Sequence, residues 1–189
     1  SGVELEMNSR PLPKLSLNAM ISVGNWEYEG NSTSNRYDAN NIPIGGGTST
    51  TLYLDGVKVG DAAQTTASIG ASYEVLTRVF LDANYRVSEN LYASIDPSRF
   101  NSATNKGTLE LPSYGLMDAG FSYKMLVGKN NSNSLNFRLN VNNVLDEVYI
   151  SESRTNIFAD DYVSGTSGPT WASSGQTYKG VANKNQVFF

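Results

Sequence analysis

The sequence predicts an all-β fold, an antiparallel transmembrane β-barrel. Three observations lead to this prediction. Apolar and polar residues alternate with a period of two along several segments, as they do in strands with one apolar and one polar face. These segments are longer than the strands of about five to six residues that are common in soluble proteins. Their connections alternate between short turns and long polar loops.

Three strands are predicted in the first part of the chain. The first is a short alternation over residues 3–7 (VELEM). In Leu15–Val23 (LSLNAMISV), Leu, Ala, Ile and Val on one face oppose Ser, Asn and Met on the other. In Thr65–Tyr73 (TTASIGASY), Ala, Ile and Tyr share a face that opposes Ser and Gly. Because the period is two throughout, each segment is predicted to be a strand and not a helix.

Four further strands are predicted in the second part. Val79–Ser88 (VFLDANYRVS) and Met117–Met125 (MDAGFSYKM) each oppose an apolar face to one that carries Asp, Asn, Arg or Lys. Leu135–Asn142 (LNFRLNVN) alternates apolar residues with Asn and Arg, and a last alternation runs from about Tyr178 to Phe189. The chain is therefore predicted to contain about seven strands and no helix.

The connections are sorted by length. Short connections lie at 10–13, 75–77 and 126–134, and long loops rich in Gly, Ser, Thr and Asn lie at roughly 30–60, 93–113 and 151–177. Tight turns at one end of the strands and long loops at the other are typical of bacterial outer-membrane barrels. A soluble β-sandwich with one wet face also alternates, and on alternation alone it is the alternative.

Composition excludes several classes of function. The 189 residues contain no Cys and no His, which removes thiolate ligands, the commonest metal ligand and the usual base at neutral pH. We therefore expect no enzymatic activity, no cofactor and no metal site. The net charge of −4 and the lack of clustered Lys and Arg argue against a nucleic-acid partner. No run of about 18 apolar residues is present that could form a membrane-spanning helix.

Charged residues on the polar faces favour the barrel over the sandwich. These residues would line a wet lumen, whereas an apolar sandwich core would tolerate them poorly. The predicted lumen-lining residues are Asp82, Arg86, Asp118, Lys124 and Arg138.

The segment LNFRLNVNNVLDEVYI (Leu135–Ile150) shows where a strand would leave the bilayer. An apolar band about 25 Å tall takes about ten residues of a tilted strand. From Leu135 this length ends near Asn143, so Asn143 should lie at the interface and Tyr149 beyond it. A β-bulge or a plain strand end at Asn142–Asn143 is the alternative.

The stretch NVNNVLDEVY (Asn140–Tyr149) resembles the C-terminal signature of TonB-dependent outer-membrane receptors. In that signature an Asn is followed by two apolar residues, Asp or Asn, two variable residues and Tyr, which places the motif on Asn143, Asp146 and Tyr149. Val144-Leu145 departs from the usual Leu-Phe. Further stretches that resemble the late strands of this family are Gly2–Ala19, Val59–Tyr73 and Leu111–Lys124.

The resemblance implies a barrel of about 22 strands, of which these residues would form about the last seven. It also implies an N-terminal plug domain and import of a nutrient, such as a siderophore, an oligosaccharide or a peptide, energised by TonB. The implied partners are outer-membrane lipid, the TonB complex, the remaining strands and plug of the same receptor, and a surface lipoprotein. A passive porin or a structural or adhesive outer-membrane barrel is the alternative function.

Strand direction also predicts that residues 1–189 are part of a larger barrel domain. If the short turns are periplasmic, the first strand and the strand at 178–189 both run toward the periplasm. An antiparallel barrel cannot close on two parallel edges, so earlier strands, the plug and the TonB-contacting segment are expected outside this chain.

Ligand recognition is predicted in the long loops. Exposed aromatic and Arg side chains on polar loops are common binding anchors. The alternative for the rings is that they pack the loops together or form the interfacial aromatic girdle. The predicted ligand-binding residues are Arg99, Phe100, Phe158, Tyr162 and Trp171.

Overall fold

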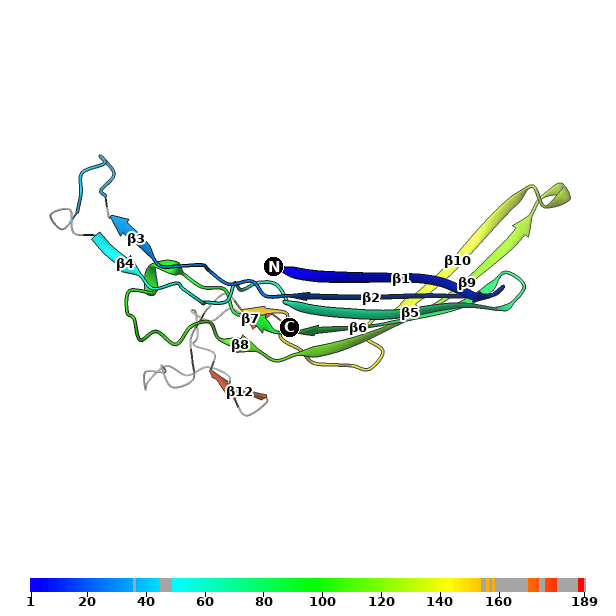
Figure 1. The fold of residues 1–189 in the computed structure, drawn as a ribbon. Coiled ribbons are helices and arrows are strands. Elements are labelled where there is room, and N and C mark those ends of the chain that lie inside the picture. Colours follow the sequence, from blue (N-terminus) through cyan, green and yellow to red (C-terminus); the bar gives the residue numbers. More distant parts are fainter. Residues whose placement is uncertain are drawn as a thin grey trace. The chain divides into compact units, whose positions relative to one another are not determined.

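The computed structural model describes residues 1–35, 37–44, 49–153, 156, 158, 170–173, 176–179 and 187–188. These residues lie in two compact units (Figure 1). The sheet unit consists of Ser1–Gly24, Gln64–Asn90 and Ser113–Tyr149. The loop unit consists of Asn25–Ala63, Leu91–Pro112 and Ile150–Phe189, as far as it is described.

The sheet unit is a six-stranded antiparallel sheet in which each strand pairs with the next long strand of the chain (Figure 1). The strands, in the order of the sheet, are β1 (Gly2–Leu12), β2 (Leu15–Gly24), β5 (Thr65–Leu76), β6 (Val79–Glu89), β9 (Tyr114–Val127) and β10 (Asn133–Val141). The prediction of an all-β antiparallel fold is confirmed. No helix among the described residues is long and apolar enough to cross a membrane.

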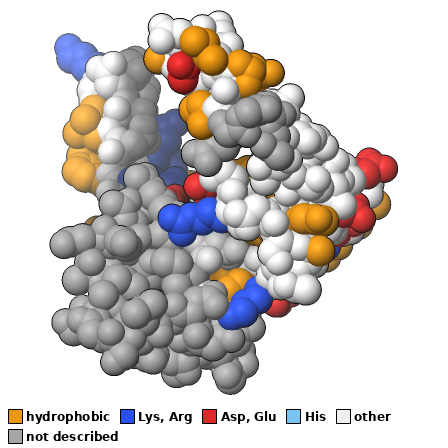
Figure 2. All heavy atoms as spheres, turned by 90° about the vertical axis from the view of Figure 1, so that its left-hand side faces the viewer, with side chains coloured by type: hydrophobic (Ala, Val, Ile, Leu, Met, Phe, Trp, Pro, Cys, Tyr) orange, Lys and Arg blue, Asp and Glu red, His pale blue; other side chains and the backbone are white. Residues whose placement is uncertain are grey.

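The strand register places apolar side chains opposite one another across the whole sheet. One such row consists of Leu15, Tyr73, Leu81, Phe121 and Leu139. Many side chains of this apolar face are uncovered: Val3 is 76% exposed, Ile69 62% and Leu139 63%. An uncovered apolar surface of this kind indicates that another apolar medium or partner covers it. Figure 2 is drawn from another side, the left-hand side of Figure 1, where hydrophobic side chains lie in small groups among other side chains.

Three tight turns join the strand pairs β1–β2, β5–β6 and β9–β10. In the last of these turns Asn130 and Asn131 both have φ of 58°, a left-handed conformation that Asn tolerates better than most residues. The other connections leave from the opposite ends of the strands and belong to the loop unit. The predicted long loops at 30–60 and 93–113 therefore fall in the loop unit, except for Ser113 at its boundary, and so do the described residues of 151–177.

The strand β1 is longer than the predicted alternation over residues 3–7. Its register with β2 shifts between Ser9 and Leu12, where the sequence is Arg-Pro-Leu. Pro11 cannot donate a ladder hydrogen bond, and an edge strand such as β1 is a place where Pro is tolerated. The turn thus follows Leu12, whereas the sequence predicted it at 10–13.

Residues 180–186 and 189 of the predicted strand at 178–189 lie outside the described part of the chain. The described residues of this segment do not join the six-stranded sheet: Tyr178 and Lys179 pair with β12, and Val187 and Phe188 pair with β11. Because six antiparallel strands are present, the edge strands β1 and β10 run in opposite directions. The parallel edges expected from seven strands are therefore not seen among the described strands of this sheet. A hairpin between near neighbours costs less loop-closure entropy than pairing with a distant strand, which favours the local pairing of β13.

Short elements build the loop unit. They form the pairs β3 (Ser32–Asn35) with β4 (Ser49–Leu52), β7 (Leu91–Tyr92) with β8 (Glu110–Leu111), β11 (Glu152–Ser153) with β14 (Val187–Phe188), and β12 (Thr170–Ser173) with β13 (Gln176–Lys179). A short 3-10 helix, η1 (Pro97–Arg99), precedes Phe100. Phe100 is buried with Leu54 and Val57, and Tyr28 and Ile95 pack against this small core.

Candidate functional site

The five predicted lumen-lining residues lie on one face of the sheet, opposite the apolar face. Two of them form an ion pair between neighbouring strands, with Arg86 Nη1 2.7 Å from Asp118 Oδ2. A second pair joins Arg138 Nη2 on β10 to Asp82 Oδ2 on β6 at 3.3 Å. Lys124 is exposed on the same face, opposite Asn136 of β10. That this polar face lines a lumen stays a prediction.

Glycines allow these polar side chains to lie against the sheet. Arg138 reaches Asp82 across β9 at the position of Gly120, where a Cβ atom would collide with the Asp82 carboxylate. On β5, a Cβ atom at Gly70 would collide with the side-chain amides of Asn18 and Asn84. The polar face consequently carries a hollow of about 700 Å³, lined mainly by Asn, Ser, Asp and Arg side chains and by these strands' backbone.

The motif residue Asn143 forms a turn at the end of β10. The strand ends at Val141. This agrees with a strand end at Asn142–Asn143, which was one of the alternatives that the sequence allowed. The Asn143 backbone N–H donates to Asp118 Oδ1 at 2.9 Å. Its side-chain Nδ2 donates to the Glu147 carbonyl at 2.9 Å, and its Oδ1 accepts from the Glu147 N–H at 3.0 Å. Asp118 therefore links the Asn143 turn to Arg86 on the polar face.

The other two motif residues complete this turn. Asp146 has φ of 53°, and its N–H donates to the Asn143 carbonyl at 3.0 Å. The Tyr149 ring packs against the Tyr114 ring with 4.3 Å between their centroids. The motif thus fixes the path of the chain between the end of β10 and the loop unit by hydrogen bonds and ring packing.

The loop unit contains a cavity of about 460 Å³, which we call the loop cavity. Its lining residues are Ser94, Asp96, Arg99, Phe100, Thr104, Asn105, Lys106, Gly107, Asn156 and Phe158. Three predicted ligand-binding residues, Arg99, Phe100 and Phe158, thus lie together. Phe100 is only 5% exposed and packs in the small core, so it forms a wall of the cavity. Tyr162 and the side chain of Trp171 lie outside the described part of the chain.

The charged groups of the loop cavity are arranged around η1. Asp96 Oδ1 accepts hydrogen bonds from Ser98 Oγ at 2.7 Å and from the Ser98 N–H at 3.0 Å. These bonds, with a smaller contribution from the Arg99 charge, lower the pKa of Asp96, so its carboxylate is charged at neutral pH. Arg99 Nε lies 3.8 Å from Asp96 Oδ2, and Lys106 Nζ lies 5.5 Å from the centre of the Phe158 ring.

Two Asn side chains hold the wall of the loop cavity. Asn105 Nδ2 donates to the carbonyls of Tyr53 and Ser102, and its Oδ1 accepts from the Gly107 N–H. Asn156 Oδ1 accepts from the Leu109 N–H at 2.6 Å, and its Nδ2 donates to the Gly107 carbonyl at 2.8 Å. Asn105, Lys106 and Asn156 were not among the residues predicted from the sequence. Asn and Lys are common in polar loops and do not indicate a site. The Thr-Asn-Lys-Gly stretch has a composition that is typical of a turn, and this was the only signal in the sequence.

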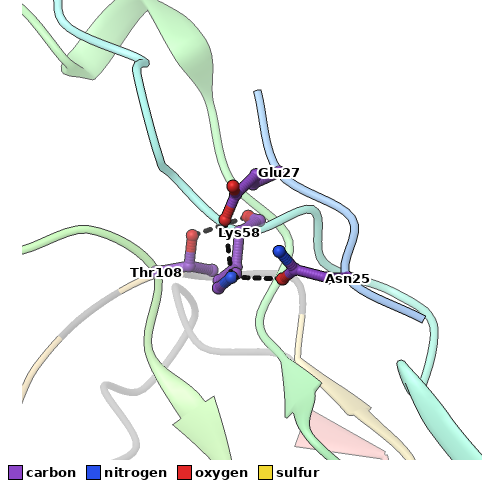
Figure 3. Close-up of polar contacts among 4 residues, drawn as sticks. All are labelled: Asn25, Glu27, Lys58 and Thr108. Atoms are coloured by element: carbon purple, nitrogen blue, oxygen red, sulfur yellow. Dashed lines mark hydrogen bonds and ion pairs between the residues drawn. The ribbon is translucent and has the colours of Figure 1, made fainter. Parts of the chain in front are cut away.

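Lys58 connects three segments of the loop unit (Figure 3). Its Nζ donates to Glu27 Oε2 at 2.6 Å and to Asn25 Oδ1 at 2.5 Å, while its carbonyl accepts from Thr108 Oγ1 at 2.7 Å. The hydrogen bond and the charge of Lys58 lower the pKa of Glu27. This network joins the segment that follows β2 to the segment around Thr108, part of which forms one wall of the loop cavity.

Comparison with known proteins gives one match. The family model described as TonB dependent receptor-like, beta-barrel matches residues 1–144. The matched range contains all six strands of the sheet and reaches the Asn143 turn. Neither a curated protein nor a solved structure matches the chain.

Proposed function

Because the chain belongs to the TonB-dependent receptor β-barrel family, a family of outer-membrane transport proteins, we propose that it takes part in the energised import of a nutrient. The import would cross the bacterial outer membrane and use energy delivered through TonB. In this proposal residues 1–189 form part of the barrel domain of a larger receptor, whose plug and TonB-contacting segment lie elsewhere in that receptor.

The observation that carries the proposal is the division of the sheet into two faces. Apolar side chains in register across six strands leave one face uncovered, which suits contact with lipid. The opposite face carries the pairs Arg86–Asp118 and Arg138–Asp82, which suit a wet lumen. A strand that separates lipid from a polar passage needs both faces.

The loop unit supplies the recognition step in this proposal. The loop cavity combines charged side chains with an aromatic wall, and its volume of about 460 Å³ falls within the range of ordinary ligand sites. We assign ligand capture to Arg99 and Phe158, with Phe100 behind them. Tyr162 and Trp171 are proposed to take part from the 151–177 loop. Bound ligand would then pass along the polar face of the sheet.

Nutrient depletion tests the proposed function. Three strains of the source bacterium are compared: the parent, one that lacks this receptor and one that lacks TonB. Each is grown on a mixture of siderophores, oligosaccharides and peptides, and the compounds that disappear from the medium are measured by mass spectrometry. We expect at least one compound to be consumed only by the parent. Consumption that needs this protein but not TonB would contradict energised import and favour a passive porin.

Point variants test the place of recognition once such a compound is known. Arg99→Ala and Phe158→Ala should each lower its uptake, because they remove a charge and a ring from the loop cavity. Lys129→Ala, in the turn between β9 and β10, is the matched control and should transport normally. Normal uptake by both cavity variants, with normal insertion, would place recognition elsewhere in the receptor.

A further inference from the structure

Arg99 is placed to receive an anion in the loop cavity. Its side chain is 76% exposed, and its ion pair with Asp96 is a long contact through Nε at 3.8 Å. The Asp96 carboxylate is held by two shorter hydrogen bonds from Ser98. Within the described part of the chain the Arg99 guanidinium makes no hydrogen bond. Since a guanidinium offers five donors in a planar fork, it can still bind a carboxylate through two parallel bonds.

Lys106 brings a second positive charge to the same cavity. Its Nζ lies over the Phe158 ring, 5.5 Å from the ring centre. A cation over an aromatic face is held by the ring quadrupole. Phe158 therefore helps to keep the ammonium group at the cavity, and both residues line it together with Arg99.

The amide groups that line the cavity are committed to its wall. Asn105 and Asn156 use both ends of their side chains to hold the backbone between Ser102 and Leu109. Such a wall is organised before a ligand arrives, which lowers the entropic cost of binding. The Arg99 guanidinium and the Phe158 ring are then the groups proposed to select a ligand, beside the Asp96 carboxylate that Ser98 holds.

We propose that the loop cavity binds a ring-bearing organic carboxylate, either an acidic sugar or an aromatic acid. The carboxylate accepts hydrogen bonds from the Arg99 guanidinium near the Lys106 ammonium, and the ring of the ligand packs in the cavity beside Phe158. This assignment rests on the proposed function, since it names the class of compound that the receptor captures. It goes further in predicting that a neutral ligand of the same shape is rejected.

A matched pair of probes tests the requirement for a carboxylate. The probes are para-nitrophenyl β-glucuronide and para-nitrophenyl β-glucoside, which differ only in a carboxylate against a hydroxymethyl group. Binding to the purified complete receptor in detergent is measured by calorimetry. We expect the glucuronide to bind about tenfold more tightly or better, because charged hydrogen bonds are stronger than neutral ones. Equal affinity for the two probes, or binding of neither, would overturn the assignment.

Charge variants show whether the preference arises in the loop cavity. Arg99→Gln and Lys106→Gln should each reduce the affinity for the glucuronide severalfold and leave that for the glucoside nearly unchanged. Lys129→Gln removes the same charge outside the loop unit and should retain the full preference. A preference that survives both cavity variants would also overturn the assignment. Circular dichroism of each variant confirms that the strands are formed.

Two further probes separate the two sources of the carboxylate. Methyl β-glucuronide carries the acidic sugar alone, and benzoate carries the aromatic acid alone. Tighter binding of the first assigns the cavity to acidic sugars, and tighter binding of the second assigns it to aromatic acids. The depletion experiment keeps this inference separate from the proposed function: TonB-dependent uptake of only neutral compounds would refute the carboxylate and leave energised import standing.

Discussion

Asn143 lies at a backbone φ of 51°, and its side-chain amide pairs with the backbone of Glu147 in both directions. Most residues other than Gly avoid this conformation, although Asn adopts it more readily than others. The pairing also requires a donor and an acceptor on one short side chain, which Asp lacks when it is ionised. These two demands explain why an Asn stands at this position of the motif.

Replacing Asn143 should therefore destabilise the protein. We expect Asn143→Ala to lower the free energy of unfolding by about 1–3 kcal/mol, because both side-chain hydrogen bonds are lost and Ala is strained at positive φ. Urea unfolding of the complete protein in lipid vesicles measures the change. Asn142→Ala, one residue earlier and exposed, is the control and should have little effect. Equal effects of the two variants would contradict the role of the turn.

Adjacent residues on β10 test which face meets lipid. Phe137 lies on the apolar face and stacks on Tyr123, with 6.5 Å between the ring centres, whereas Arg138 lies on the polar face. Phe137→Arg should cost about 2–4 kcal/mol if the position is near the middle of the bilayer.

Arg138→Gln is the partner variant and should cost much less, since the Arg138 side chain is 59% exposed in its ion pair with Asp82. Folding free energies of both variants in lipid vesicles decide the matter. An equal or larger cost at Arg138 would refute the assignment of the two faces.

At the scale of elements, the loop unit is held by side chains that bridge its segments. The Glu27–Lys58 pair links the segment after β2 to the segment that follows β4. The pKa of Glu27 is lowered in the folded protein, so the pair contributes stability above the unfolded pKa. This contribution is lost as the pH falls through the folded pKa. The Glu27–Lys58 ion pair should therefore be lost at low pH.

The pH dependence of the loop unit tests this link. Near neutral pH, the backbone amide hydrogens of Tyr28 and Val59 should exchange faster in the Glu27→Gln variant than in wild type. Both amides donate hydrogen bonds between the two segments that the ion pair links. As the pH falls from about 6 to about 3, the difference should shrink as Glu27 becomes protonated. Hydrogen exchange, corrected for the intrinsic effect of pH, measures it. Glu29→Gln is the control. A difference that persists at the acid end would contradict the role of the ion pair.

At the scale of the whole molecule, the uncovered apolar face and the two edge strands determine in which environment the chain is stable. Exposed apolar residues such as Val3, Leu5 and Leu139 would face water if these residues were isolated. The edge strands β1 and β10 would also offer unpaired backbone groups to other chains.

Residues 1–189 expressed alone should therefore aggregate, whereas the complete receptor should fold into lipid vesicles. Light scattering and protease protection of the two proteins measure the difference. A monodisperse, heat-resistant barrel formed by these residues alone would contradict the prediction that they are part of a larger barrel domain.

The sequence by itself determined the two faces of the sheet and the sorting of short turns and long loops. A period of two assigns each side chain to a face without knowledge of its neighbours, and turn residues act locally. The Asn143 motif was also visible, because its residues are close in the chain. Its contact with Asp118 was not visible, because that contact joins residues 25 positions apart.

Only the tertiary structure decided which of these residues meet. The strand register brings Arg138 to Asp82 over Gly120, and the loop fold brings Arg99, Lys106 and Phe158 to one cavity. It also placed the described parts of 178–189 in two-stranded pairs with β12 and β11, outside the six-stranded sheet, and buried Phe100 in a small core. These outcomes depend on contacts between distant segments and on the entropy of closing the loops between them, which a local pattern of residues does not contain.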